Sequence, residues 1–496
     1  MSSSTVPTSQ QQIKQYLRKH KKKWSEEKSA SGDIKRSGQS TGQRSLNKSN
    51  SYSYVKAKPV LMRKGRTTID HLPDEVLYKI FSFFGAHHLL LTARVCKRWN
   101  ILANDNLLWA EIFKTYAPNK KKDTTLEPEN IPFSFWKSQC IKRCSDQRNK
   151  DAFRHLRKLH PYTGLPRETN KILERCGIQW VLVLQDSRGE QHEMRACGNF
   201  PFCMSSLVRW YSLQSPSLRE IRKIQVYSIN PLFFERGRAV ANSPYQRSLL
   251  LELELKWDSW VRTNSPTSSD DLVNLYLLPQ GVMLATWKGD GELAFVAACL
   301  HHHQLVQRCL YGTRQSAFIP TLPKPVFDDV DKTYGLHDYS CTMELHHQRQ
   351  SIWNQQFRRL HCKRENLVGG YAFFDLIRPD YSSDHSIISQ KIVLPWKTDA
   401  FKGRLENVTI LDMTILDEQG HPFWCLSSPV SLQSTSEGLS FDYSSDGCCC
   451  IKYVEPKGKV VMELNWSPDR EQYFVTRLLV AVSLQAINDW FGTLYK

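Results

Sequence analysis

Residues 69–109 read IDHLPDEVLYKIFSFFGAHHLLLTARVCKRWNILANDNLLW, and their apolar content is high for so short a segment. On a helix of 100° per residue, residues 73–84 spread six large apolar side chains over an arc of roughly 160°. An apolar stripe of roughly 100° is enough for a helix that faces a single core. The greater width predicts a second apolar surface, which faces something other than the core of the segment itself.

The limits of the predicted helices follow from the residues at their ends. Pro73 suits the first helical position because the backbone donor that it lacks would be unpaired there, and the acidic pair that follows matches the helix dipole. Gly85 is expected to end this helix. A second amphipathic helix is predicted over residues 94–103. A segment of roughly 40 residues is marginally stable alone, so an outside partner is implied.

The order of residues in this segment resembles the F-box family. The family pattern is present as Leu72-Pro73, Glu75-Val76-Leu77, Ile80-Phe81-Ser82, Leu89-Leu90, Val95-Cys96-Lys97-Arg98-Trp99 and Leu108-Trp109. The resemblance implies a three-helix module that docks on a Skp-type adaptor, which links it to a cullin scaffold and a RING subunit in an E3 ubiquitin ligase. By motif matching, the expected adaptor-binding residues are Leu72, Pro73, Leu77, Ile80, Phe81, Val95, Cys96 and Trp99. The alternative is an ordinary amphipathic hairpin within a larger core.

The positive charge of the chain is concentrated at its N-terminal end. The 496 residues carry a formal net charge of +18, and residues 1–66 hold 16 Lys or Arg against 3 acidic residues. This tail is rich in Ser, Gln and Lys and poor in large apolar side chains, a composition typical of disorder. Such a tail can contact nucleic acid weakly or serve nuclear import, although many basic tails only aid solubility.

Targeting signals and the cysteine pattern indicate the cellular compartment in which the protein is expected. The N-terminal region lacks the apolar core of a secretory signal. The apolar stretch 473–484 is too short to span a membrane and contains Arg477. The 14 cysteines follow no disulfide pattern, so we expect reduced thiols in a cytoplasmic and/or nuclear protein.

Past the first helical segment, the pattern changes from helix to strand. Helices are predicted within residues 133–160 and 167–176. The predicted strands are residues 180–184, 249–255, 282–287, 293–298, 408–416, 423–426, 460–466 and 473–482. Because no helices separate them, an α+β fold is expected, in which the strands form an antiparallel sandwich or a barrel-like sheet. The predicted domains are a disordered basic tail (1–66), the F-box (67–115), a helical linker (116–176) and a β-rich substrate-recognition domain (177–496).

Parts of the β-rich region also resemble a vertebrate member of the F-box family. These stretches are Pro161-Tyr162-Thr163-Gly164-Leu165-Pro166, Glu292-Leu293-Ala294-Phe295-Val296, Tyr334-Gly335-Leu336-His337, Trp396-Lys397-Thr398-Asp399, His421-Pro422-Phe423-Trp424-Cys425, Ser427-Ser428-Pro429-Val430 and Trp490-Phe491-Gly492-Thr493. The resemblance implies a substrate receptor but assigns no substrate-binding residue. The chain contains no internal repeat of the kind that other F-box proteins carry.

Candidate catalytic and metal-binding patterns are weak. His301-His302-His303 would point to alternate faces of a strand and could not converge on one ion. The four residues Cys140, Cys144, His155 and His160 imitate zinc ligands, but a one-turn spacing between the cysteines fits a helix face better. Cys448-Cys449-Cys450 has unsuitable geometry for a tetrahedral site, and no Gly-rich phosphate loop is present. We therefore expect a non-catalytic protein without cofactor or metal.

These observations favour the substrate-recognition subunit of an SCF-type ubiquitin ligase, which promotes ubiquitination by proximity. One alternative is an F-box scaffold that acts outside a ligase, and another is a nucleic-acid-binding protein that uses the basic tail. A weaker one is a glycan-binding sandwich, suggested by the tryptophans Trp257, Trp260 and Trp353. The sequence predicts neither the substrate nor the surface that binds it.

Overall fold

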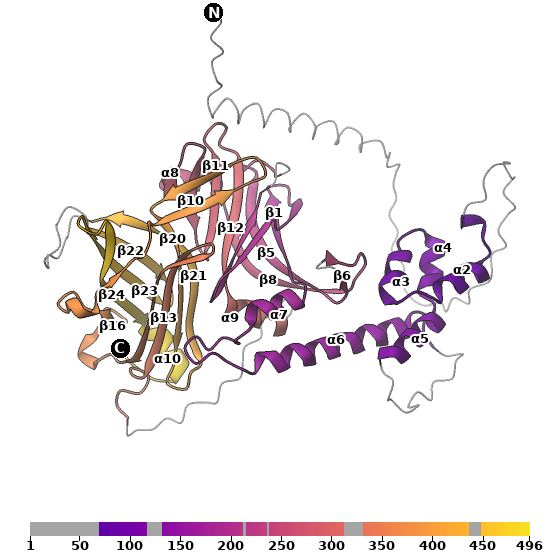
Figure 1. The fold of residues 1–496 in the computed structure, drawn as a ribbon, viewed down its shortest axis with the longest axis horizontal. Helices are drawn as coiled ribbons and strands as arrows, with labels where there is room; N and C mark the ends of the chain where they lie inside the picture. The colour runs from indigo at the N-terminus through magenta and orange to yellow at the C-terminus, as the bar shows by residue number, and fades with distance from the viewer. Residues whose placement is uncertain (1–68, 117–130, 212–214, 236–237, 312–330, 436–447) are drawn as a thin grey trace, which may run out of the picture. The chain divides into compact units, whose positions relative to one another are not determined.

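A computed structural model describes residues 69–116, 131–211, 215–235, 238–311, 331–435 and 448–496 of the chain (Figure 1). These residues belong to two structural units, with the division between Cys140 and Ile141. The first unit is helical and the second is rich in strands. The predicted basic tail, residues 1–66, lies outside the described residues. In the ranges given above, none of the helices combines the length and the apolar character needed to cross a bilayer.

The helical unit consists of short helices around a small apolar core. Its elements are η1 (Ile69–His71), α2 (Asp74–Phe81), α3 (Ala86–Thr92), α4 (Lys97–Ala103), α5 (Asn106–Tyr116) and the start of α6 (Phe135–Leu156). The first three α-helices are the predicted three-helix module, and α5 adds a fourth helix. The buried core side chains are Leu77, Phe81, Ala86, Leu89, Leu90, Ala93, Ala103, Leu108 and Trp109.

Two of the predicted helix limits were wrong. Gly85 does not end α2, because Ser82 already caps that helix and Gly85 instead precedes α3 with an ordinary extended backbone. The helix predicted over residues 94–103 begins only at Lys97, where the Cys96 sulfur accepts a hydrogen bond from the backbone N–H of Trp99. Val95 therefore lies in the turn before α4 and not on the helix.

The second unit contains three main sheets, all built from antiparallel pairs. The four-stranded sheet has the order β2 (Gln191–Arg195), β1 (Gln179–Asp186), β5 (Ile221–Pro231) and β8 (Tyr245–Glu254). The six-stranded sheet has the order β3 (Gly198–Pro201), β4 (Ser205–Trp210), β12 (Leu293–His301), β11 (Val282–Trp287), β10 (Val273–Leu278) and β9 (Ser268–Ser269). Strand pairing confirms the predicted hairpin of β11 and β12, whose central residues pair Leu284 with Val296.

The ten-stranded sheet is formed mainly by the C-terminal part of the chain. Its order is β14 (Gln350–Leu360), β13 (Tyr339–His347), β20 (Val408–Leu416), β21 (Pro422–Ser434), β22 (Cys448–Glu455), β23 (Gly458–Ser467), β24 (Gln472–Ser483), β16 (Tyr371–Ile377) and β15 (Leu367–Val368), with β17 (Ser386–Ile387) beside β24. Two small hairpins are β6 (Phe234–Glu235) with β7 (Arg238–Ala239), and β18 (Val393–Lys397) with β19 (Lys402–Glu406). Within the described residues no sheet closes on itself, so the barrel-like alternative is excluded there.

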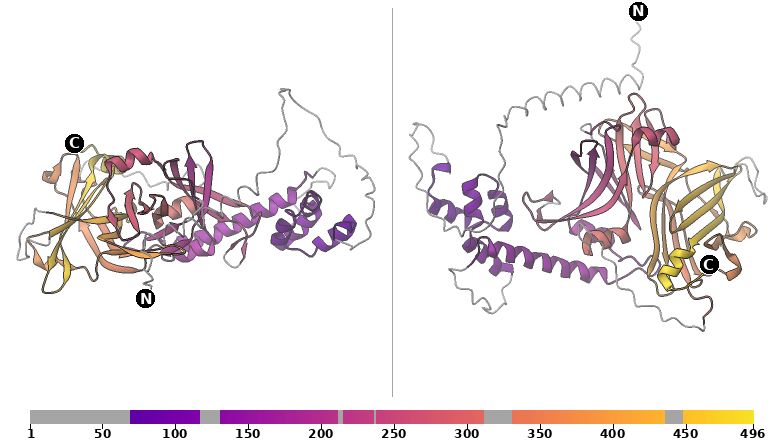
Figure 2. Two further views of the ribbon diagram at one scale, coloured as in Figure 1. Left: turned by 90° about the horizontal axis from the view of Figure 1, so that it is seen from above. Right: turned by 180° about the vertical axis from the view of Figure 1, so that it is seen from behind.

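Short helices complete the second unit. They are the rest of α6, then α7 (Thr169–Arg175), α8 (Trp257–Thr263), α9 (His302–Leu305), η3 (Val306–Tyr311), η4 (Arg364–Asn366), η5 (Ser382–Asp384) and α10 (Leu484–Phe491). The last helix, α10, buries Leu484, Ile487 and Phe491 in the same apolar cluster as the ten-stranded sheet. It lies beside that sheet at the C-terminus, as two further views show (Figure 2).

The central strands β11 and β12 of the six-stranded sheet are buried on both faces, which explains their continuous apolar sequence. On one face, Leu284 and Val296 pack in a cluster with the four-stranded sheet, α7 and α8. On the other face, Met283 and Phe295 pack against β18, β19 and β20. The tryptophans considered for glycan binding are not exposed, because Trp257 and Trp353 are buried and Trp260 packs against the first of these clusters.

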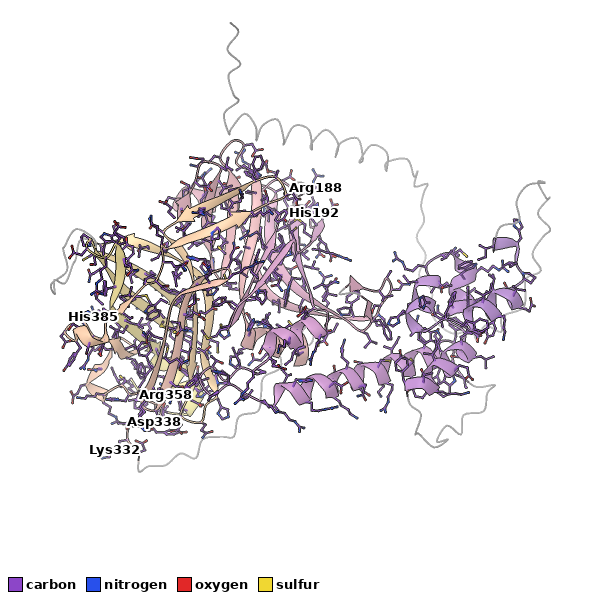
Figure 3. The ribbon with its side chains drawn as sticks, in the orientation of Figure 1. Arg188, His192, Lys332, Asp338, Arg358 and His385 are labelled. Carbon is purple, nitrogen blue, oxygen red and sulfur yellow. The ribbon has the colours of Figure 1, made fainter. Side chains whose placement is uncertain are left out.

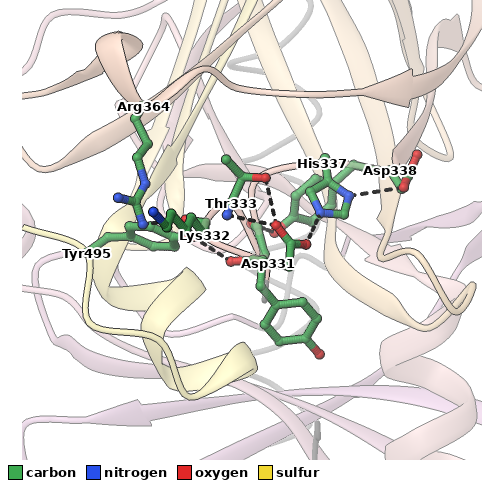
Figure 4. A network of polar contacts seen from close by, with 10 residues as sticks. Asp331, Lys332, Thr333, His337, Asp338, Arg364 and Tyr495 are labelled. Atoms are coloured by element: carbon green, nitrogen blue, oxygen red, sulfur yellow. Dashed lines mark hydrogen bonds and ion pairs between the residues drawn. The ribbon is translucent and has the colours of Figure 1, made fainter. Parts of the chain in front are cut away.

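A polar network holds the segment 331–338 in place (Figure 4). The His337 ring lies between two carboxylates, with Nε2 2.6 Å from Asp331 and Nδ1 3.0 Å from Asp338. Tyr495, near the C-terminus, donates its hydroxyl proton to the carbonyl oxygen of Tyr334 at 2.7 Å. These contacts connect the start of the ten-stranded sheet to the end of the chain.

Candidate functional site

The apolar arc of α2 is divided between the core and the surface of the helical unit. Leu77 and Phe81 are 0% and 1% exposed, whereas Val76, directly before Leu77, and Phe83, two residues past the end of α2, are 42% and 78% exposed. On α2 a step of 100° per residue explains the division, because Val76 is turned by that angle from Leu77. The wide arc therefore contains an inner stripe for the core and an outer stripe that is open.

Aromatic packing fixes the inner side of this site. The rings of Phe81 and Trp99 meet edge to face at 5.4 Å, and Phe81 also stacks on Phe84 at 5.6 Å. Trp109 is fully buried and donates its indole N–H to the carbonyl oxygen of Ala103 at 2.8 Å. These contacts hold α2, α4 and α5 in fixed positions, so the outer stripe is presented on a rigid support.

Arg98 joins the start of α2 to α4, a role that the sequence analysis did not assign. Its guanidinium donates to the Asp74 carboxylate at 2.7 Å and to the Leu72 carbonyl oxygen at 2.5 Å. Both contacts hold the Leu72-Pro73 segment against α4. The opposite charges of Asp74 and Arg98 were visible in the sequence, but their separation of 24 residues gave no sign of pairing.

The eight predicted adaptor-binding residues differ in their solvent exposure. Pro73, Val95 and Cys96 are exposed, and Leu72, Ile80 and Trp99 are half-buried. Leu77 and Phe81 belong to the core of the unit itself. In this arrangement six of the eight are accessible to a partner, and the other two support them from beneath.

Further exposed apolar side chains enlarge the accessible set. Besides Val76 and Phe83, they include Ile101 at 62% and Leu107 at 69% exposure. The sequence analysis missed all four, and the outer half of the apolar arc was the signal for Val76 and Phe83. So many large apolar groups on a small unit are typical of a surface that binds another protein.

The indole nitrogen of Trp99 is an unsatisfied donor at this site. Trp99 Nε1 is shielded from solvent, and no acceptor among the described residues bonds to it. Leaving a buried N–H unpaired costs on the order of 1–3 kcal/mol.

The helical unit extends beyond the four short helices into the start of α6. Trp136 packs its ring against Phe113 at 5.3 Å, and its backbone N–H donates to the Asn106 side chain at 3.2 Å. Lys137 donates to the Asn104 side-chain oxygen at 2.7 Å and lies over the Trp109 ring. Burial lowers the pKa of Lys137. These contacts place the first turns of α6 with the helical unit.

The histidine run does not lie on one strand, so that part of the sequence prediction was wrong. His301 ends β12, while His302 and His303 begin α9. Each ring has its own partner: His301 contacts the Thr414 hydroxyl, His302 the Ser206 hydroxyl, and His303 the Thr163 carbonyl oxygen. These contacts account for the histidines without a metal ion.

Within the described residues, only Asp186, Glu190 and His192 bring three potential ligand atoms close together. They lie at the turn between β1 and β2, where Arg188 and His192 are labelled in Figure 3. Asp186 accepts the backbone N–H groups of Arg188 and Glu190, both at 2.9 Å. Burial opposes ionisation of this carboxyl, but these hydrogen bonds and His192 lower its pKa. The Asp186 carboxylate thus stabilises the turn between β1 and β2.

Comparisons with known proteins agree with the helical site and extend beyond it. Residues 69–115 match the F-box-like family. The chain is 31% identical to F-box only protein 15 of Bos taurus over 86% of its own length and 94% of the relative. It is 32% identical to the Homo sapiens protein of that name over 86% of each chain, and 27% identical to the Mus musculus one over 85% of this chain and 100% of the relative. The similarity therefore covers the strand-rich unit as well as the helical site.

Proposed function

The chain belongs to the family of F-box only protein 15, and from that membership we propose that it is the substrate-recognition subunit of an SCF-type E3 ubiquitin ligase. F-box proteins are in general non-catalytic subunits of such complexes. The helical unit binds a Skp-type adaptor, and through it a cullin and a RING subunit. The strand-rich unit binds a protein substrate in the cytoplasm or nucleus.

The observation that carries the adaptor proposal is the set of exposed large apolar side chains on the helical unit. Val95 is 60% exposed in the turn before α4, and Phe83 is 78% exposed after α2. Burying such side chains against a partner gains about 25 cal/mol per Å² of apolar surface removed from water.

The chain contributes to the reaction by proximity. A substrate held on the strand-rich unit and an enzyme held on the cullin share one assembly, which raises the effective concentration of a substrate lysine near the ubiquitin thioester. This role requires no catalytic residue, cofactor or metal in the chain. The role requires two separate binding surfaces, one for the adaptor and one for the substrate.

Co-purification of the full chain with a Skp-type adaptor tests the first surface. We expect Val95→Glu to reduce adaptor recovery at least tenfold without lowering the melting temperature, because the new charge would be buried at the interface. The matched control is Val454→Glu, which changes a valine of 66% exposure on β22 in the other unit. Equal recovery of both variants would contradict the proposal.

Affinity purification under proteasome inhibition tests the second surface. The full chain and a form lacking residues 69–115 are compared by mass spectrometry. Proteins that both forms retain, and that accumulate ubiquitin only with the full chain, are the expected substrates. Adaptor binding without cullin would instead support the scaffold that acts outside a ligase.

A further inference from the structure

A cavity in the strand-rich unit opens where the six-stranded and ten-stranded sheets meet. Its volume is about 480 Å³, within the range of sites that bind small molecules or short peptide segments. The end of β12, α9 and η3 form one wall, and β21, β22 and α10 form the other. The F-box does not contribute to it.

The first wall carries side-chain amides. Gln280, Gln304 and Gln307 all line the cavity. The amide of Gln304 is fixed through a hydrogen bond to the Leu250 carbonyl oxygen at 3.3 Å. A glutamine amide offers both donors and acceptors, which is what a peptide group requires from its partner.

The lining from β21, β22 and α10 includes aromatic rings that neighbouring side chains hold in place. Phe423 and Trp490 meet edge to face at 5.5 Å, and the Trp490 indole donates to Asp417 at 3.1 Å. Tyr453 also lines the cavity and donates its hydroxyl proton to Glu455 at 2.8 Å. Aromatic rings and side-chain amides in one cavity suit an extended chain, which has amide planes to stack and side chains to bury.

The cavity carries no excess charge. Glu455 and Lys457 are its formally charged residues, and their charges are opposite. Burial lowers the pKa of His301 to about 3, and it lowers the pKa of His303 as well, so both rings are neutral at pH 7. Burial raises the pKa of Cys425 to about 12, which keeps that thiol protonated. The charges of Glu455 and Lys457 sum to zero, so a charged ligand group would lose hydration here without meeting a net opposite charge.

We propose that this cavity binds an extended, uncharged and unphosphorylated peptide segment of a substrate protein. The peptide groups bond to the glutamine amides, and an apolar or aromatic side chain packs on Phe423 and Trp490. This inference rests on the proposed receptor function and adds the chemical class of the segment that the receptor recognises. It also distinguishes the chain from receptors that recognise phosphorylated residues.

Selection from a phage-displayed library of random heptapeptides tests the proposal, with the full chain purified in complex with its adaptor as target. The enriched peptides should contain few charged residues. Synthetic copies, titrated by fluorescence anisotropy, should bind at least tenfold more weakly to Gln307→Glu, because that change adds a negative charge to the half-buried lining without changing the shape. A phosphoserine in the same peptides should weaken binding to the unchanged chain by a similar factor.

Gln191→Glu, on exposed strand β2, is the matched control and should bind the peptides normally. Gln280→Glu, at an exposed turn position, provides a second cavity variant if Gln307→Glu folds poorly. The proposal is overturned if no peptide is enriched, if acidic or phosphorylated peptides bind best, or if the cavity variants bind as the control does. Each of these results leaves the adaptor complex intact, whereas loss of that complex would count against the proposed function instead.

Discussion

Ser205 donates its hydroxyl proton to the carboxylate of Asp412 at 2.6 Å and so joins β4 of the six-stranded sheet to β20 of the ten-stranded sheet. The same carboxylate accepts hydrogen bonds from Ser427 at 2.6 Å and from the His346 ring at 3.0 Å. Asp412 is 0% exposed and His346 is 1% exposed. Burial opposes ionisation of Asp412, yet His346, His301 and Ser205 hold its pKa below the usual value. One buried anion thus holds the two sheets together.

Asp412→Ala should destabilise the strand-rich unit by on the order of 3 kcal/mol, because two hydroxyls and an imidazole lose their buried acceptor together. Urea unfolding followed by tryptophan fluorescence measures the change. The control is Asp258→Ala, which removes a 62% exposed carboxylate that pairs with Arg219 at 3.7 Å. That variant should differ from the unchanged chain by less than about 0.5 kcal/mol. A loss below about 1 kcal/mol for Asp412→Ala would contradict the assigned role.

Stability should fall as the pH rises through neutrality because of His337. Burial disfavours the charged ring, but Asp331 and Asp338 raise its pKa above the usual value. Since the folded pKa is the higher one, the stabilisation is complete below the unfolded value of about 6.5 and is lost as the pH rises through the folded value.

His337→Gln should therefore remove this pH dependence while the control His361→Gln, at an exposed position, retains it. The expected difference is less than about 1 kcal/mol, because Asp338 is 60% exposed and water screens the pair. Melting temperatures measured at pH 6 and pH 8 provide the test. An unchanged pH profile in His337→Gln would show that the ring is neutral in the folded chain.

Leu77→Ala and Val76→Ala should separate folding from adaptor binding. Leu77 is 0% exposed, so its truncation should cost about 2–5 kcal/mol and lower the melting temperature of the helical unit. Val76 is 42% exposed, so its truncation should leave the melting temperature nearly unchanged and weaken adaptor binding. Thermal melting and adaptor co-purification of both variants are the measurements. Adaptor binding that resists Val76→Ala would place the docking surface elsewhere.

Deletion of residues 1–66 should reduce nucleic-acid binding and leave the adaptor bound. The segment holds 16 Lys or Arg against 3 acidic residues, and such charges act through forces that salt screens. Raising the salt concentration from about 0.05 to 0.5 M should release RNA from the full chain, while the apolar adaptor interface persists. Filter binding and adaptor co-purification measure the two activities. Nucleic-acid binding that survives both the deletion and the salt would place that site in the strand-rich unit.

The strands that could be predicted are those in which most of the buried residues are apolar. Strand β20 has large apolar side chains at six of its nine positions and was recognised despite its buried Asp412, as were β11, β12 and β24. Its neighbour β13 was missed because it contains Glu344 and His346, which are 4% and 1% exposed. Polar residues normally indicate a solvent-facing strand, and only the hydrogen bonds made across the finished sheets reveal that these are buried. Pairing between strands so distant in sequence leaves no local pattern.

The sequence predicted that the F-box segment has two apolar surfaces, but it did not predict which residues are buried and which are exposed. The width of the apolar arc indicated two surfaces, yet periodicity could not assign Leu77 to one and Val76 to the other. That division depends on where α4 packs, and α4 begins three residues later than the sequence suggested. The cavity between the sheets was beyond prediction, because its lining comes from residues between 280 and 490 that only the folded sheets bring together.

The separation of 207 residues between Ser205 and Asp412 also sets an order of events on the ribosome. At about 5–20 residues per second, β4 emerges some 10–40 s before the carboxylate that it needs. The contacts of the helical unit are complete by Cys140, far earlier in synthesis. We therefore expect a nascent chain to display a finished F-box while its receptor is still unformed. Chains that stop before Asp412 would then keep a functional adaptor-binding end and occupy adaptor without delivering any substrate.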